Sequence, residues 1–209
     1  TIREGDQLLE AKMTTGNSHI MMAVKSGKAI HFEEEKVRSM GRTAAGVRGI
    51  RLASDNDEVV GMICIEDVNT SVLVVAENGY GKRSAVEDYR ITNRGGKGVK
   101  TINITEKTGQ LISLKNVSDE DDLMVINKSG ITIRIGVDTL RVMGRATQGV
   151  KLIRLRDEDS IASVAKVSKF ESEEDDIEVN LESNDLEEKN IVDNDEQNQS
   201  NDSKDLTEE

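Results

Sequence analysis

Two sequence signatures each occur three times in this chain, and this internal repeat constrains the fold more than any other feature. The first is an apolar run that ends in a polar turn and a glycine, and the second is a glycine followed by valine and a basic residue. The glycines of the first signature are Gly27, Gly79 and Gly130, and those of the second are Gly46, Gly98 and Gly149. Both sets recur at intervals of 52 and 51 residues. Periods near 50 residues are typical of propeller blades, which must stack to bury their apolar faces.

Short runs with alternating β-branched residues predict an all-β fold. The predicted strands cover residues 7–13, 19–24, 29–32, 59–65, 71–76, 82–86, 131–135, 150–155 and 161–167. A further strand is expected to begin after each glycine of the second signature. Gly27 is expected at positive φ, in a tight turn between two paired strands.

The charge is distributed unevenly along the chain. The net charge is −12, yet residues 169–209 alone contain 17 acidic and 3 basic residues, a net charge of −14. Residues 1–168 therefore carry a net charge of +2. The sequence predicts a β domain over residues 1–168 and a disordered acidic tail over residues 169–209. A slightly basic body beside an acidic tail indicates a nucleic-acid partner, for which the tail would compete.

No pattern in the sequence predicts a catalytic site, a bound metal or a membrane span. The two histidines, His19 and His31, lie on predicted strands, and no Cys/His spacing matches a metal site. Tyr80 and Tyr89 have no neighbouring base in the pattern. No apolar run reaches the roughly 18–20 residues of a membrane helix. We therefore expect no catalytic residue, no metal and no cofactor in this chain.

The glycine-rich stretch Arg94-Gly95-Gly96-Lys97-Gly98 is the candidate binding loop. It is not a Walker phosphate loop, because Lys97 precedes Gly98 and a strand rather than a helix is expected to follow. One interpretation is a tight turn between repeats. The other is a loop that places cations against a phosphate backbone. The second is favoured by repetition, because Arg42 and Arg145 occupy the equivalent positions in the other two copies.

The candidate DNA-binding residues are basic residues in these loops and in the strands beside them. They are Arg42, Arg48, Arg51, Lys82, Arg83, Arg94, Lys97, Lys100, Arg134, Arg145, Lys151 and Arg154. Aromatic residues make up 2% of the chain, so base-stacking on single strands is poorly supported. There is no recognition-helix pattern either. These features favour backbone contacts with double-stranded DNA, which are largely independent of sequence and sensitive to salt.

The repeats resemble the C-terminal domain family of the bacterial DNA gyrase A subunit. The matching stretches cover nearly all of residues 1–168 and include residues 46–52, 78–83 and 142–150. The resemblance implies a β-pinwheel, a propeller variant with four-stranded antiparallel blades, of which three repeats form about half of a ring. The family's box motif, Gln-Arg-Arg-Gly-Gly-Lys/Arg-Gly, matches Arg94 to Gly98 in its last five positions. Thr92 and Asn93 replace its first two residues, so a degenerate copy of the box is expected.

The resemblance also implies a function and partners. It implies duplex DNA wrapped on the outer rim, which supports negative supercoiling by an ATP-dependent type II topoisomerase. Expected partners are the cleavage domain of the A subunit and the B subunit, in a cytoplasmic, nucleoid-associated complex of two A and two B subunits. ATP and Mg²⁺ would belong to the B subunit and the cleavage core. The alternatives are the C-terminal domain of the topoisomerase four A subunit, or a propeller that scaffolds proteins.

Overall fold

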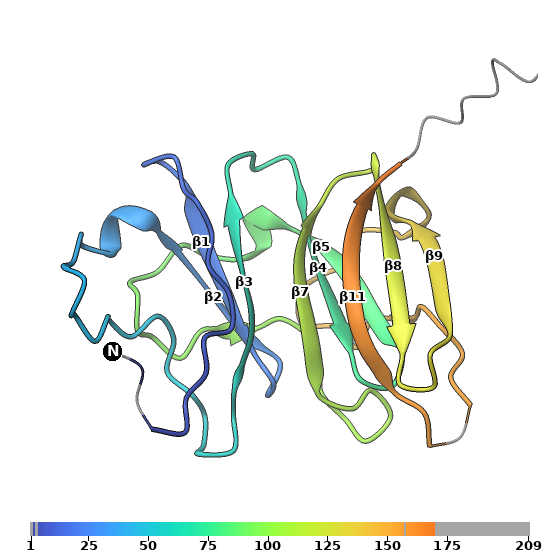
Figure 1. Cartoon of the computed structure of the whole chain (residues 1–209). Helices are drawn as coiled ribbons and strands as arrows, with labels where there is room; N and C mark the ends of the chain where they lie inside the picture. The colour runs from blue at the N-terminus through green and yellow to red at the C-terminus, as the bar shows by residue number, and fades with distance from the viewer. Residues whose placement is uncertain (1, 3, 157, 170–209) are drawn as a thin grey trace, which may run out of the picture. The chain divides into compact units, whose positions relative to one another are not determined.

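A computed structural model describes residues 2, 4–156 and 158–169, which form three consecutive antiparallel sheets (Figure 1). The first sheet has the order β3 (Val59–Ile65), β1 (His19–Val24), β2 (Lys28–Glu33), β6 (Val99–Lys100). The second has the order β7 (Leu111–Val117), β4 (Ser71–Ala76), β5 (Tyr80–Ala85), β10 (Val150–Lys151). The third has the order β11 (Ile161–Ser168), β8 (Asp121–Asn127), β9 (Thr132–Gly136). A short 3-10 helix follows the hairpin of each sheet, at η1 (Glu34–Lys36), η2 (Val86–Asp88) and η3 (Val137–Thr139).

Successive sheets exchange strands. β6 follows β5 in the chain, yet it pairs with β2 of the preceding sheet, with Lys28 opposite Lys100. β10 follows β9 and pairs in the same way with β5, with Tyr80 opposite Lys151. Each exchanged strand is a glycine-valine-basic segment. The second repeat signature therefore marks the crossing between neighbouring sheets, which explains why it recurs with the same period as the hairpin turns.

The two edges of each sheet lie in different surroundings. β3 packs against β7, and β7 packs against β11, so these edge strands of successive sheets meet (Figure 1). β6 and β10 lie at the opposite edges of their sheets. We call the edges formed by β3, β7 and β11 the inner edges, and those formed by β6 and β10 the outer edges. The glycine-rich loops lead into the outer edges.

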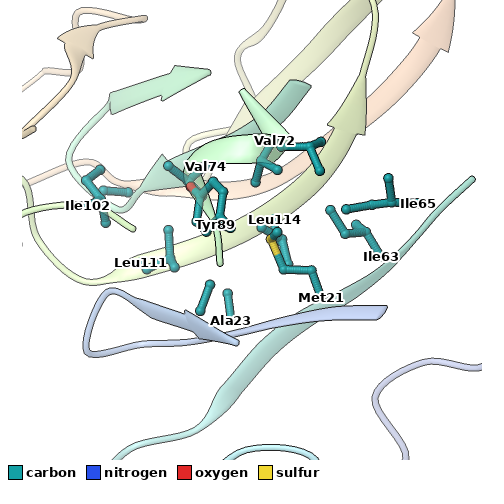
Figure 2. Packing of buried hydrophobic residues seen from close by; sticks show 13 residues of the cluster. Met21, Ala23, Ile63, Ile65, Val72, Val74, Tyr89, Ile102, Leu111 and Leu114 are labelled. Carbon is teal, nitrogen blue, oxygen red and sulfur yellow. The ribbon is translucent and has the colours of Figure 1, made fainter. Parts of the chain in front are cut away.

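The core consists of apolar clusters, two of which lie between successive sheets, while a third, which includes Ile20, Phe32 and Ile50, covers the other face of the first sheet. The cluster between the first and second sheets includes Met21, Val72, Val74 and Leu114 (Figure 2). The cluster between the second and third sheets includes Leu73 and Val75 of the same strand, β4. All six residues of β4 are buried, because its two faces contribute to two different clusters. This double burial explains why its sequence is a continuous apolar run rather than an alternating one.

Most strands expected from the sequence are confirmed. The hairpin turn is confirmed as well, because Gly27 has a φ of +79°. The strand expected at residues 7–13 is wrong: this stretch forms no strand, and Glu10 instead accepts a hydrogen bond from the Met62 amide of β3 through its side chain, at 3.3 Å. The strand expected at 150–155 is limited to Val150–Lys151. Residues 47–52 form no strand.

The third sheet contains three strands among the described residues rather than the four expected. A fourth strand in this fold comes from the next glycine-valine-basic segment, and the chain contains no fourth copy of that segment. The predicted acidic tail lies outside the described residues, apart from Lys169.

Candidate nucleic-acid interface

The exchanged strands enter the outer edges through glycines that approach the neighbouring backbone closely. Gly98 has a φ of +70°, and a Cβ on it would lie 2.5 Å from the Ala29 carbonyl oxygen of β2. Gly149 has a φ of +84°, and its Cβ would lie 2.6 Å from the Gly81 carbonyl oxygen of β5. A side chain fits neither the dihedral angle nor the space. These two glycines therefore place the basic residues Lys100 and Lys151, two positions later, on the outer edges.

Backbone hydrogen bonds join the loops of successive repeats. The Gly95 amide donates to the Gly49 carbonyl at 2.6 Å, and the Arg51 amide donates to the Gly96 carbonyl at 2.8 Å. One repeat later, the Asn103 amide donates to the Thr147 carbonyl at 3.1 Å. The segments after Gly46 and Gly98 thus contact the glycine-rich loop of the following repeat. The loops form one continuous row along the outer edges.

Two of the predicted DNA-binding arginines hold this row together. Arg94 donates from Nε to the Lys36 carbonyl at 3.0 Å and from Nη1 to the Arg48 carbonyl. Arg145 donates from Nε to the Asp88 carbonyl at 3.1 Å and from Nη1 to the Lys100 carbonyl at 2.9 Å. The carbonyls that they bind are at equivalent positions, one repeat apart. Each guanidinium therefore bridges the end of a 3-10 helix and the glycine-valine-basic segment of the preceding repeat.

Arg145→Lys should test this bridging role. A lysine keeps the charge, but its single ammonium group cannot hold two separate carbonyls in the geometry of a planar guanidinium. We expect the free energy of unfolding to fall by about 1–2 kcal/mol, because hydrogen bonds from a charged donor contribute about that much each. Chemical denaturation of the full chain measures the change. The matched control is Lys97→Gln, an exposed residue of the neighbouring loop, which should leave stability unchanged; equal losses would contradict the bridging role.

The other loop and strand cations point to solvent. They are Arg42, Arg48, Arg51, Lys97, Lys100, Lys151 and Arg154, and all seven are exposed. None of them joins an ion pair with an acidic residue in the described part of the chain. Lys100 Nζ donates to the Asn103 amide oxygen at 3.3 Å. We call these seven residues the cation row.

An aromatic ring lies beside one end of the row. Lys151 Nζ lies 5.8 Å from the centre of the Tyr80 ring, and Lys107 Nζ lies 5.5 Å from it. Both distances fall within the range of cation–π attraction. Lys107 was not among the candidates predicted from the sequence, because no repeat signature includes it. Lys107 comes close to Tyr80 of β5 only in the folded chain, so no sequence pattern indicates this contact.

The structure does not bring three of the predicted residues into the row. Lys82 is 1% exposed, and its ammonium donates to the Gly144 carbonyl at 2.6 Å and to the Ser84 hydroxyl at 3.2 Å. Arg83 is buried and forms an ion pair with Asp119. Arg134 is exposed but pairs with Asp122 at 2.6 Å. The sequence pattern could not separate these residues from the row, since burial depends on which face of the strand meets the next sheet.

The pKa of Lys82 is lowered from its usual 10.5 to about 8, mainly by burial; the charge of Asp88 opposes this shift, and the charge of Arg145 adds to it. The unfolded chain therefore holds this proton up to about pH 10.5, whereas the folded chain releases it near pH 8. Folding then becomes more favourable as pH rises between these values. Each pH unit in this range adds about 1.4 kcal/mol to the free energy of unfolding, so the total gain is at most about 3 kcal/mol.

Lys82→Met should remove this pH-dependent component. We expect the difference in unfolding free energy between wild type and variant to shift in favour of wild type from pH 8 to pH 10, in denaturation curves at fixed salt. Below pH 8 the difference should be constant. A difference that stays flat across the whole range would contradict a lowered pKa for Lys82.

Other kinds of site receive no support from the described residues. Within them, no group of three or more His, Cys, Asp or Glu side chains is placed to hold a metal ion. The same part of the chain contains no helix with the length and apolar character needed to cross a membrane.

His19 Nδ1 and His31 Nε2 lie 2.9 Å apart, and His31 Nδ1 lies 2.7 Å from the Tyr89 carbonyl oxygen. Burial lowers the pKa of His31, which suits a neutral ring packed between the first two sheets.

Comparisons with known proteins match this arrangement of repeats. The family model of the "DNA gyrase C-terminal domain, beta-propeller" matches three segments, residues 18–66, 70–118 and 121–168. The DNA gyrase A subunit of Staphylococcus aureus strain MRSA252 is 45% identical over 175 residues, which cover 83% of this chain and 20% of that protein. Its counterpart in strain NCTC 8325 is 44% identical over the same coverage. This chain therefore spans about a fifth of the length of these curated relatives.

Solved structures share the fold. The "Structure of DNA gyrase A C-terminal domain" superposes with a TM-score of 0.72 at 26% identity, and covers 79% of this chain and 56% of that one. The "C-terminal domain of DNA topoisomerase IV" superposes with a TM-score of 0.74 at 22% identity, and covers 80% of this chain and 52% of that one. At that identity the second likeness concerns the fold alone.

Proposed function

This chain belongs to the DNA gyrase C-terminal domain, beta-propeller family, and from that membership we propose that it binds double-stranded DNA along its outer edges and bends it. The observation that carries the proposal is the cation row. Basic side chains recur at equivalent positions of successive repeats, exposed and without acidic partners among the described residues. A duplex presents regularly spaced phosphates, so a repeated row of cations complements it without reading its sequence.

Bending follows from the way the row is built. Its loops belong to successive sheets, and backbone hydrogen bonds and the arginine bridges hold them in fixed positions. A duplex that contacts several loops must follow the row. Bending 20–30 base pairs by 40–90° costs on the order of 1–6 kcal/mol, so contacts from several repeats have to act together.

The role in the longer protein is part of the same proposal. Because the chain spans about a fifth of its gyrase relatives, supercoiling would be an activity of the whole enzyme, supported here by wrapped DNA. This part would have no chemistry and no cofactor of its own. Its partners would be duplex DNA, the cleavage domain of the A subunit and the B subunit, which would use ATP and Mg²⁺. Such a complex would work beside the nucleoid in the cytoplasm.

The experiment that tests the proposal is a bending assay with a duplex labelled at both ends. The full chain is titrated into the duplex over a series of salt concentrations, and energy transfer between the labels reports the bend. Energy transfer that rises with protein and falls steeply with salt is expected. Binding without a change in energy transfer would contradict the bending part of the proposal. No binding at low salt would reject the whole proposal and favour a scaffold for proteins.

A further inference from the structure

A cavity of about 650 Å³ lies between the first and second sheets, beside η2. This volume is within the range of small-molecule sites. Its polar lining includes His19, His31 and Arg90. Three apolar side chains that are 50–63% exposed gather around it, namely Val68, Ile91 and Val142. The cavity therefore combines groups that can hold a positive charge with apolar surface that the fold leaves uncovered.

The two histidine rings form a hydrogen-bonded chain that ends at His19 Nε2. A carbonyl oxygen can only accept, so His31 Nδ1 donates to the Tyr89 carbonyl at 2.7 Å. The other ring nitrogen of His31 lies 2.9 Å from His19 Nδ1, and these two atoms share a single proton. A proton added to the pair therefore creates an N–H at His19 Nε2, which has no hydrogen-bond partner in the described part of the chain. This free donor on a charged pair suits an anion.

The equivalent place in the next repeat contains a cation that has a carboxylate partner. His31 lies four residues after the turn glycine Gly27, and Arg83 lies four residues after Gly79. Arg83 is buried and pairs with Asp119, in the turn that joins the second sheet to the third. The repeat thus shows which chemical group a basic side chain at this position binds.

Val68 takes the position of Asp119 in the gap between the first two sheets. The turns at 67–70 and 118–121 correspond, because in each the amide of the fourth residue donates to the carbonyl of the first, at 3.4 and 3.3 Å. Val68 and Asp119 are the second residues of these turns. The first gap therefore has the basic side of the pair without its carboxylate, and has a cavity and an exposed apolar side chain instead.

We propose that this cavity binds a small organic monocarboxylate with an apolar body, such as a medium-chain fatty acid. Its carboxylate takes the place that the Asp119 carboxylate has in the next gap, and accepts hydrogen bonds from His19 and Arg90. Arg90 is exposed and has no acidic partner in the described part of the chain. Glu87 also lines the cavity and disfavours a second negative charge on the ligand. The proposal does not depend on DNA binding.

Titration of the full chain with octanoate, followed by NMR, tests the site at about pH 6, below the usual pKa of histidine. The chain has 2 histidines and both line the cavity, so their imidazole C–H resonances report on this site directly. Both resonances should shift and saturate, with a dissociation constant in the millimolar range. Octanamide has the same apolar body without the charge and should bind at least about ten times more weakly, because it lacks the ionic hydrogen bond. Equal binding of the two probes, or no saturable shift with octanoate, would overturn the proposal.

Two variants with matched controls locate the carboxylate. Val68→Asp should supply the missing carboxylate from the chain itself and weaken octanoate binding at least about tenfold, whereas Val68→Leu should keep it within about twofold. Arg90→Gln should weaken binding about two- to fivefold, as expected for an exposed ion pair. Arg141→Gln changes the equivalent arginine of the next repeat, which does not line the cavity, and should leave binding unchanged. Full binding by Val68→Asp or by Arg90→Gln would overturn the proposal.

Discussion

Gly98→Ala is expected to lower the free energy of unfolding by about 4 kcal/mol, which is a large effect for the addition of one methyl group. Left-handed backbone costs an alanine about 1–2 kcal/mol. The added Cβ would also lie 2.5 Å from the Ala29 carbonyl oxygen and 2.8 Å from its carbonyl carbon. These are backbone atoms of a buried strand and cannot rotate away, so overpacking adds about 1–3 kcal/mol. Urea denaturation of the full chain measures the sum.

Gly46→Ala is the matched control. Gly46 has the same place in its repeat and a φ of +81°, but nothing lies within 4 Å of its Cβ. The Gly46→Ala variant should lose only the free energy that an alanine needs to adopt a left-handed backbone, about 1–2 kcal/mol. The difference between the two variants isolates the close approach of the exchanged strand to β2. Equal losses for both would mean that the strand exchange contributes nothing to the need for glycine at Gly98.

The repeat and the hairpins could be predicted because their determinants are local. A turn at Gly27 needs positive φ, and an alternating run needs only one buried face, so both leave a trace in the sequence. The failed strand at residues 7–13 shows the limit of this approach. Its alternation suits a strand, but a strand also requires an edge to pair with. Pairing is decided by the rest of the fold, and in the described part of the chain this stretch is joined to β3 through the side chain of Glu10.

The binding loops show a second limit. Sequence repetition singled out the basic residues but could not divide them by role. Arg94 and Arg145 bridge backbone carbonyls, Lys82 is buried, and Lys97 points to solvent. The positive charge that favours DNA also favours carbonyl groups at the ends of short helices. Only the geometry of the exchanged strands separates the residues that bridge carbonyls from those that point to solvent; DNA binding by the second group stays a prediction.

Neutralising the cation row should weaken DNA binding on the order of a hundred- to thousand-fold while the chain stays folded. The variant replaces Arg48, Lys97, Lys100 and Lys151 by glutamine. All four are exposed and lack acidic partners among the described residues, so their loss leaves no buried charge unpaired. If each neutralises one phosphate, the slope of log affinity against log salt should flatten by about 3 to 4. Binding isotherms over a salt series measure both quantities.

The control removes the same charge from the inner edges. Lys115 lies on β7 and Lys166 on β11, and Lys12 pairs with Glu10 beside β3 at 2.7 Å. Replacing these three and Lys169 by glutamine changes the net charge by the same amount. If the outer edges bind DNA, this variant should keep nearly the full salt slope, because phosphates held at the row do not contact the inner edges. An equal loss of slope in both variants would mean that DNA responds to net charge alone, and the row would then have no special role.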